Sequence, residues 1–297
     1  MPESARLVFG PRVSDRTAHT RSWAWLPSVD PGWPGHYWVT EEYDDDDARW
    51  YARISDSGNR TVRPVVLIHG LIVSGSYFRP VASYLDDHMR LYVPDLPGFG
   101  KSVSHTGIWT LEHLTEGLAG WLDLHGLRDA MLISNSLGCQ VLTMLAVQRP
   151  DLVHTLVLVA PTMDPAATSI PRLMVRGLID IPRETSSLWK VWLPDFVRAG
   201  PRRGLLTLHN AIVDRQEERL SRVTAKVILV GGERDPIVPP DWVRAMAGMF
   251  PNGRVLIIPK APHAMNYSNP RELARIIRVA VMSADDDARS GGVMMES

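Results

Sequence analysis

The stretch Ala130-Met131-Leu132-Ile133-Ser134-Asn135-Ser136-Leu137-Gly138-Cys139 decides how the rest of the chain is interpreted. Its first four residues are mostly apolar and predict a buried strand, and the segment that follows predicts a helix that stops before Pro150. Between the two, Ser136 has a small residue two positions away on either side, Ser134 and Gly138, a variant of G-x-S-x-G. Bulky side chains would clash there, because a sharp turn brings the flanking backbones together. The pattern predicts a turn that presents the Ser136 hydroxyl at the N-terminus of a helix.

The composition excludes several classes of protein. The 297 residues are enough for a full hydrophobic core, and a formal net charge of −1 gives no global field for nucleic acid or an acidic membrane. A single cysteine excludes an intrachain disulfide. Since we find no apolar signal core and no segment long enough to span a bilayer, we expect a cytoplasmic protein without nucleic-acid or membrane partners. The alternative that the protein forms a homodimer is left open by the composition.

Short, continuous apolar runs alternate along the chain with helical stretches. Continuous apolarity indicates strands buried on both faces, as in a parallel sheet covered by helices. Two β-rich runs, 36–42 and 48–56, come first. The buried strands that we expect are 65–69, 90–94, 130–133, 155–160, 226–230 and 254–259, and the helices are 77–87, 111–125, 137–149, 241–249 and 270–282. This alternation predicts a doubly wound α/β fold with functional loops at the carboxyl ends of its strands.

Three segments depart from this alternation. Residues 1–35 are rich in Pro, Gly and Trp and predict an arm that packs on the main body. Residues 162–223 contain helical pieces punctuated by prolines and no good strand, which predicts an inserted helical cap. Residues 283–297 are acidic with Gly and Ser, which predicts a disordered tail. The α/β core then consists of 36–161 and 224–282. Basic residues outnumber acidic ones in the cap, which favours a solvated outer face over an anionic substrate site.

A serine hydroxyl needs an adjacent base, and the base needs an acid that orients it. Asp235 follows the expected strand 226–230, and His263 follows the expected strand 254–259. The chain order is therefore Ser136, Asp235, His263, with each residue just past a strand. Because the carboxyl ends of parallel strands lie at one edge of a sheet, we expect these three residues to form a catalytic triad.

Other residues near these loops have secondary roles in this interpretation. The strand 65–69 runs into a glycine-containing loop, and the backbone N–H of Leu71, with that of Leu137, would form an oxyanion hole. Asp164 is the weaker candidate for the acid, and Cys139 is expected to be a packing residue. The ten histidines show no metal-ligand spacing, so we expect no metal.

Taken together, these motifs resemble the α/β-hydrolase superfamily, in its serine-nucleophile branch with a helical cap. The matching segments are His69-Gly70, Asp95-Leu96-Pro97-Gly98-Phe99-Gly100-Lys101-Ser102, Ser134-Asn135-Ser136-Leu137-Gly138, Gly232-Glu233-Arg234-Asp235 and His263. The resemblance implies a mostly parallel eight-stranded sheet flanked by helices, a cap and no cofactor. The dehalogenase and epoxide-hydrolase branches have Asp as nucleophile, so a serine argues against both.

The resemblance also implies an activity. We expect hydrolysis of a small or medium ester, lactone or thioester, a small-molecule substrate, through an acyl-enzyme on Ser136. The candidate pocket residues are Ile72, Met163, Trp189, Trp192, Met265 and Tyr267. Two alternatives stay open: C–C bond hydrolysis of a vinylogous diketone acid, and a non-catalytic small-molecule receptor on the same fold.

Overall fold

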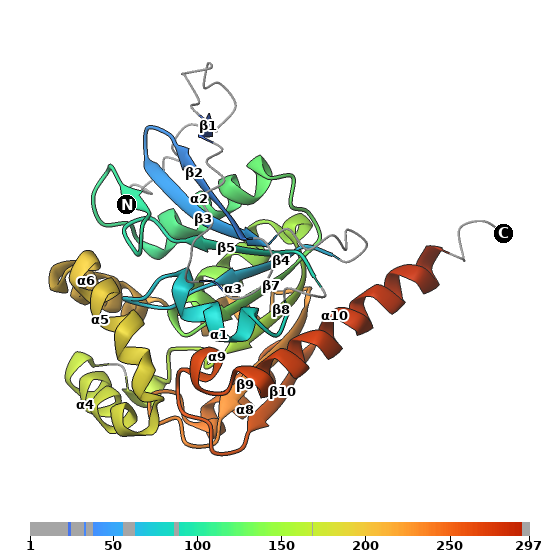
Figure 1. The fold of residues 1–297 in the computed structure, drawn as a ribbon. Helices are drawn as coiled ribbons and strands as arrows, with labels where there is room; N and C mark the ends of the chain where they lie inside the picture. The colour runs from blue at the N-terminus through green and yellow to red at the C-terminus, as the bar shows by residue number, and fades with distance from the viewer. Residues whose placement is uncertain are drawn as a thin grey trace, which may run out of the picture.

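The computed structural model describes residues 23–24, 33, 38–55, 63–85, 89–167 and 169–292 (Figure 1). The strands form one sheet in the order β1-β2-β3-β5-β4-β7-β8-β9-β10, with β6 beside β3. Their bounds are Trp23–Ala24 (β1), Trp38–Asp44 (β2), Ala48–Ser55 (β3), Val65–Ile68 (β4), Leu91–Asp95 (β5), Val103–Ser104 (β6), Ala130–Asn135 (β7), Val153–Val159 (β8), Lys226–Gly232 (β9) and Gly253–Ile258 (β10). The expected α/β sheet of eight strands is confirmed, with β1 and β6 added as two-residue strands.

The direction of the strands changes once across the sheet. All pairs from β5 through β4, β7, β8 and β9 to β10 are parallel. The pairs β1–β2, β2–β3, β3–β5 and β3–β6 are antiparallel. The parallel part contains every strand that precedes a candidate site loop, so those loops leave the same edge of the sheet.

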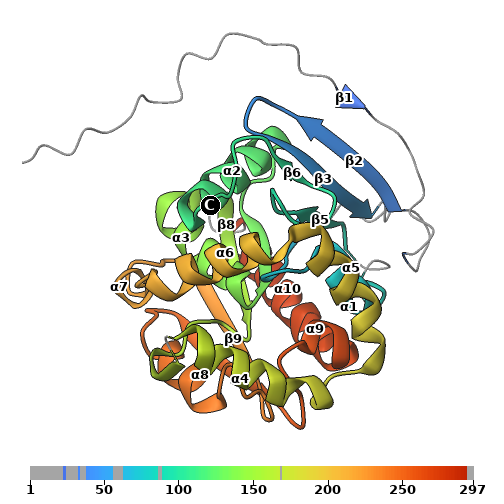
Figure 2. The same ribbon diagram turned by 90° about the vertical axis from the view of Figure 1, so that its left-hand side faces the viewer.

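Helices cover both faces of the sheet. Their bounds are Arg79–Ala82 (α1), Leu111–Leu124 (α2), Leu137–Gln148 (α3), Ile170–Asp180 (α4), Trp189–Ala199 (α5), Pro201–Val213 (α6), Glu217–Leu220 (α7), Pro240–Ala247 (α8), Met265–Ser268 (α9) and Pro270–Gly292 (α10). Figure 2 separates α2 and α3 on one side of the sheet from α1, α9 and α10 on the other. The expected helix 77–87 is shorter, because α1 ends at Ala82.

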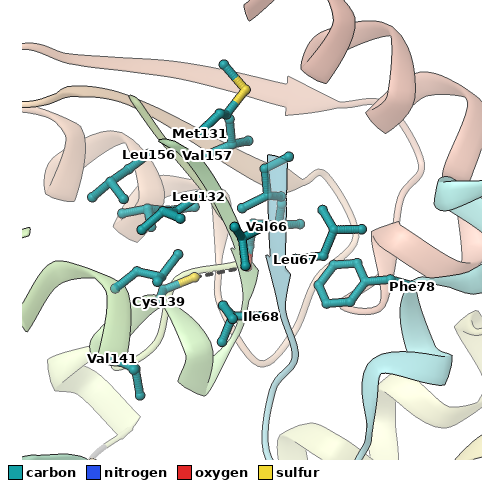
Figure 3. Close-up of a cluster of buried hydrophobic side chains, with 14 of the residues drawn as sticks. Val66, Leu67, Ile68, Phe78, Met131, Leu132, Cys139, Val141, Leu156 and Val157 are labelled. Carbon is teal, nitrogen blue, oxygen red and sulfur yellow. Dashed lines mark hydrogen bonds between the residues drawn. The ribbon is translucent and has the colours of Figure 1, made fainter. Parts of the chain in front are cut away.

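The centre of the core lies where β4 and β7 meet α3. Every residue of β4 is buried, as the continuous apolar run predicts (Figure 3). Ten of the twelve residues of α3 are also buried, so this helix is packed on all sides. In α2, by contrast, the apolar residues form one stripe, and the Thr110 hydroxyl accepts the backbone N–H of His113 at 3.3 Å as the N-cap. Local sequence therefore fixes which faces of the helices pack inward.

The segment between β8 and β9 is helical and consists mainly of α4, α5, α6 and α7. Figures 1 and 2 place α4, α5 and α6 together on one side of the molecule, at the left in Figure 1 and nearest the viewer in Figure 2. We call residues 162–223 the helical insertion. Among the helices that the structure describes, none is long and apolar enough to cross a membrane.

The two ends of the chain differ from expectation in one respect. In the N-terminal arm, β1 pairs with β2, and the buried Trp33 ring lies 4.3 Å from the Trp38 ring; Trp25 and most other arm residues lie outside the described residues. The expectation of a disordered tail from residue 283 is wrong for the first part of that tail, because α10 continues to Gly292. Its helical hydrogen-bond ladder extends past the apolar residues that pack on the sheet. Residues 293–297 lie outside the described part.

Candidate active site

Ser136 lies at the turn between β7 and α3 in a backbone conformation that L-residues avoid, with φ 54° and ψ −120°. Such a conformation costs about 1–3 kcal/mol and persists only where surrounding contacts fix it. Two contacts do so: the Ser136 N–H donates to the carbonyl of Val159 at 2.9 Å, and the Ser136 carbonyl accepts from the N–H of Cys139 at 2.9 Å. The half-buried Ser136 side chain is thereby presented at the N-terminus of α3.

The small residues around this turn are required by close backbone approaches. A Cβ at Gly138 would lie 2.7 Å from the carbonyl oxygen of His69, closer than real Cβ atoms come. A Cβ at Gly70 would lie 3.2 Å from the Cβ of Ser136. Ser134, where the G-x-S-x-G pattern has glycine, is fully buried, and its hydroxyl donates to the Cys139 sulfur at 3.2 Å. The turn therefore packs directly against the loop that follows β4.

The imidazole of His263 and the carboxylate of Asp235 are joined by a hydrogen bond of 2.8 Å between Nδ1 and Oδ2. The Asp235 side chain is fully buried and that of His263 is 12% exposed. The other Asp235 oxygen accepts the backbone N–H groups of Ile237 at 2.8 Å and Val238 at 2.9 Å. Since the Asp235 carboxylate is held on both sides, it fixes the orientation of the imidazole and favours a proton on Nδ1.

Asn135 connects the turn at Ser136, which we call the serine turn, to the loop that carries His263, which we call the histidine loop. Its side-chain amide donates to the backbone carbonyls of His263 and of Val159, both at 3.4 Å. The structure thus brings all three predicted residues to the carboxyl edge of the parallel strands. The role of Asn135 was missed in the sequence, where it is only a polar residue beside Ser136.

A pair of carboxylic acids from the helical insertion also contacts the histidine loop. Asp180 accepts the backbone N–H of His263 at 3.3 Å, and Glu184 accepts that of Ala264 at 2.6 Å. The second oxygen of Glu184 accepts the hydroxyl of Ser268 at 2.5 Å. Burial, followed by the negative charge of Asp180, raises the pKa of Glu184 to about 8. No sequence motif indicated these residues, because they act through a contact between segments far apart in the chain.

These carboxylates control the basicity of His263. Burial by itself lowers the pKa of this imidazole, but Asp235, Asp180 and Glu184 raise it, and the result is a pKa of about 9. An uncharged imidazole with Nδ1–H held by Asp235 has a free acceptor at Nε2, which is the form that a general base requires. The base form of His263 therefore increases with pH up to about pH 9.

The loop after β4 contains the first predicted oxyanion residue, Leu71, which packs partly against the main core. The next residue, Ile72, has φ 59°, and a Cβ added at Gly204 of α6 would lie 3.2 Å from its side chain. His69 shapes the loop: Nδ1 lies 2.8 Å from the carbonyl oxygen of Gly70, and Nε2 accepts the N–H of Leu96 at 2.9 Å. Leu137, the second oxyanion candidate, is the first residue of α3.

The candidate pocket residues separate into two groups. Trp192 and Tyr267 pack around a small apolar cluster of Val73, Tyr77 and Ala264, next to the histidine loop. Trp189 is 44% exposed beside Trp192, at 5.1 Å between ring centroids. Met163 and Met265 instead belong to the main core and are buried there. The structure therefore gives no support for these two methionines as a pocket wall, because their side chains pack inward.

Asp164 and Cys139 have roles outside the predicted triad. Asp164 forms an ion pair with Arg176 at 2.6 Å, so its carboxylate is occupied by a partner other than the histidine. Cys139 is fully buried, and burial raises the pKa of its thiol to about 12. A thiol in this state is a packing group and a poor nucleophile.

A family model described as the alpha/beta hydrolase family matches residues 65–276, well over half of the chain. The chain belongs to this family. Among sequence relatives, an uncharacterized hydrolase of Bacillus subtilis is 23% identical over 255 residues, covering 77% of this chain and 92% of the relative. A pimeloyl-[acyl-carrier protein] methyl ester esterase of Aeromonas salmonicida is 27% identical over 249 residues, covering 73% of this chain and 94% of the relative.

Solved structures of the family share the fold. A putative lipase from Acinetobacter baumannii superimposes with a TM-score of 0.74 at 17% sequence identity, covering 84% of this chain and 93% of that one. At this level of identity the match establishes the architecture alone. The family's fold places catalytic loops at the carboxyl ends of the strands, where Ser136, Asp235 and His263 lie.

Proposed function

We propose that this protein is a serine hydrolase of carboxylic esters, with Ser136 as nucleophile, His263 as general base and Asp235 as the orienting acid. The observation that carries the proposal is the 2.8 Å hydrogen bond from His263 to the buried Asp235, at the same sheet edge as the strained turn of Ser136. A buried carboxylate bonded to one imidazole nitrogen leaves the other nitrogen as a base.

In the first half of the reaction, the Ser136 oxygen attacks the ester carbonyl carbon while Nε2 of His263 accepts the hydroxyl proton. The backbone N–H groups of Leu71 and Leu137 stabilise the negative charge that develops on the carbonyl oxygen. Collapse of the tetrahedral intermediate breaks the ester C–O bond, and His263 gives its proton to the departing alcohol. The product of this half is an acyl-enzyme on Ser136.

In the second half, His263 removes a proton from a water molecule, which attacks the acyl carbonyl carbon. The second tetrahedral intermediate breaks at the Ser136 oxygen, which regains a proton from His263, and the carboxylic acid leaves. The carboxylate of Asp235 stabilises the imidazolium in both steps. Trp192 and Tyr267, beside the histidine loop, supply apolar surface for the acyl or alcohol part of the substrate.

The relatives support ester chemistry in particular. The Aeromonas salmonicida relative is a methyl ester esterase, and it aligns over almost its whole length. Ester hydrolysis uses each group described above without a further cofactor.

The test is turnover of p-nitrophenyl esters of increasing acyl length by the wild type and by Ser136→Ala, together with labelling by a fluorophosphonate probe. We expect ester hydrolysis and labelling in the wild type and neither in the variant. A folded wild type that takes no label would favour the receptor alternative. Cleavage of a vinylogous diketone acid without any ester turnover would favour the C–C bond hydrolase.

A further inference from the structure

Exposed apolar side chains are concentrated on the helical insertion. In the part of the chain that the structure describes, sixteen large hydrophobic side chains are exposed, and eleven of them lie between residues 174 and 213. Scattered exposed apolar residues are normal on a protein surface, but a concentration on one face indicates an interaction site.

In α4 and α5 the exposed apolar residues form stripes. Leu178 follows Met174 by four positions in α4, and both are at least 60% exposed. In α5, Trp189, Leu193 and Val197 recur every four positions, and each is at least 44% exposed. Residues four apart lie on the same face of a helix, so each helix presents one apolar stripe to solvent.

The inward sides of these helices carry apolar residues, such as Leu173 of α4 and Ile212 of α6, together with polar or small ones. In α5 the buried residue is Asp195, and in α6 the buried residues are Gly204, Thr207 and Ala211. Leu205 and Val213 of α6 are 50% and 58% exposed. Each of these helices therefore has apolar residues on its exposed side as well as on the side that packs on the molecule, unlike a helix whose apolar residues face only the core. None of the residues that the structure describes buries these stripes, which leaves them available to a partner.

The charges beside the stripes have one sign. Over residues 170–213, all of which are described, the exposed charged side chains are five basic residues and no acidic one. The basic residues are Arg172, Arg183, Lys190, Arg198 and Arg202. In α5, Lys190 and Arg198 immediately follow residues of the apolar stripe. The face therefore combines apolar side chains with a positive rim.

The combination of apolar stripes and basic residues favours one class of partner over the others. A second copy of the chain would bring two positive faces together, and the like charges would repel. An acidic protein would pair with the basic residues but would leave exposed leucines and valines against a polar surface. An anionic lipid surface satisfies both, since apolar side chains enter the boundary between headgroups and acyl chains while Lys and Arg contact phosphates.

We propose that the outward faces of α4, α5 and α6 dock this protein on anionic lipid surfaces. The proposal goes beyond the esterase function and does not depend on it. It also departs from the expectation of no membrane partner, which rested on the lack of a segment that could span a bilayer and on the net charge of the whole chain. A net charge averages over all faces, and the positive face of the insertion is balanced by acidic residues elsewhere.

The experiment is co-sedimentation of the full chain with vesicles of phosphatidylcholine containing phosphatidylglycerol, and with vesicles of phosphatidylcholine alone. We expect binding to the anionic vesicles, weakened by added salt. The double variant Leu193→Ser/Val197→Ser should bind the anionic vesicles at least about tenfold more weakly than the wild type. The double variant Lys190→Glu/Arg202→Glu should lose most of the binding. Circular dichroism of each variant checks that it is folded.

Matched controls lie on α10. Val279, 59% exposed, and Arg271 are exposed on another element, so Val279→Ser and Arg271→Glu should bind like the wild type. Ser136→Ala should also bind like the wild type, which separates this proposal from the proposed function. Equal binding by folded Leu193→Ser/Val197→Ser and wild type would overturn the proposal. It would also be overturned by no binding to anionic vesicles, by binding to an acidic acyl carrier protein instead, or by dimerisation through this face.

Discussion

The carboxylate of Glu184 accepts the backbone N–H of Ala264 at 2.6 Å, one residue beyond His263. Its neighbour Asp180 accepts the N–H of His263 itself at 3.3 Å. Both acids belong to the helical insertion, so the loop that carries the histidine is fixed from a segment more than seventy residues earlier in the chain. This contact links the position of the insertion to the geometry and basicity of the site.

The charge of Glu184 is expected to tune His263. In Glu184→Gln the amide oxygen still accepts the Ala264 N–H, but the nearby negative charge is removed. The pKa of His263 should fall, and the rising limb of kcat/KM should move to lower pH by a fraction of a unit. Glu218→Gln, an exposed change in the same insertion, is the control and should leave the profile unmoved. If the rising limb of the kcat/KM profile of Glu184→Gln moved to higher pH instead, the claim that the charge of Glu184 raises the pKa of His263 would be contradicted.

The pH dependence of the wild-type rate follows from the raised pKa of His263. The general base must be uncharged, so the active fraction grows as pH rises toward the pKa of about 9. We expect kcat/KM to rise roughly tenfold per pH unit below that value and to level off above it. A pH series with a neutral p-nitrophenyl ester, in overlapping buffers, measures this. A plateau that starts near pH 7 would show that the carboxylates do not raise the basicity.

The same groups predict how stability changes with pH. The pKa of Glu184 rises from 4.5 to about 8 and that of His263 from 6.5 to about 9 on folding, so folding favours the protonated form of both. Their contribution to the free energy of unfolding is complete below the unfolded values and is lost as pH rises through the folded ones. We expect Tm to fall between pH 5 and 9, more gently in Glu184→Gln. An equal slope in both proteins would be inconsistent with this.

Asp235 and Asp164 can be distinguished by a matched pair of substitutions. Asp235→Asn keeps the shape but removes the charge that orients His263, and should lower kcat by about three to four orders of magnitude. Asp164→Asn breaks only the ion pair with Arg176 and should change kcat by less than about tenfold. Ester turnover of both purified variants decides between them. The reverse result would make Asp164 the acid.

Two glycine substitutions test the packing of the serine turn. In Gly138→Ala the new Cβ would lie 2.7 Å from the His69 carbonyl, so the turn must shift, and both Tm and kcat should fall. Gly120 in the middle of α2 is exposed and has no atom within 4 Å of the added Cβ. Gly120→Ala should therefore stabilise the protein by about 0.5–1 kcal/mol without affecting kcat. Thermal melts and ester assays of both variants provide the comparison.

Most of the fold could be predicted because its strands are continuous apolar runs. The expected strand 65–69 and β4, or 226–230 and β9, differ by no more than two residues at either end. The predictions failed where burial depends on distant partners. Met265 follows the histidine loop in sequence but is packed into the main core, and α10 extends ten residues past its expected end.

The sequence by itself determined the order of Ser136, Asp235 and His263 and their places after parallel strands, because strand periodicity and turn sterics are local properties. Only the tertiary structure decided that Asp180 and Glu184 hold the histidine loop, since that contact joins segments that have no common pattern. The tertiary structure also decided the orientation of α4, α5 and α6. Apolar residues lie on more than one side of these helices, and the packing of one side on the rest of the molecule determines which of them stay exposed.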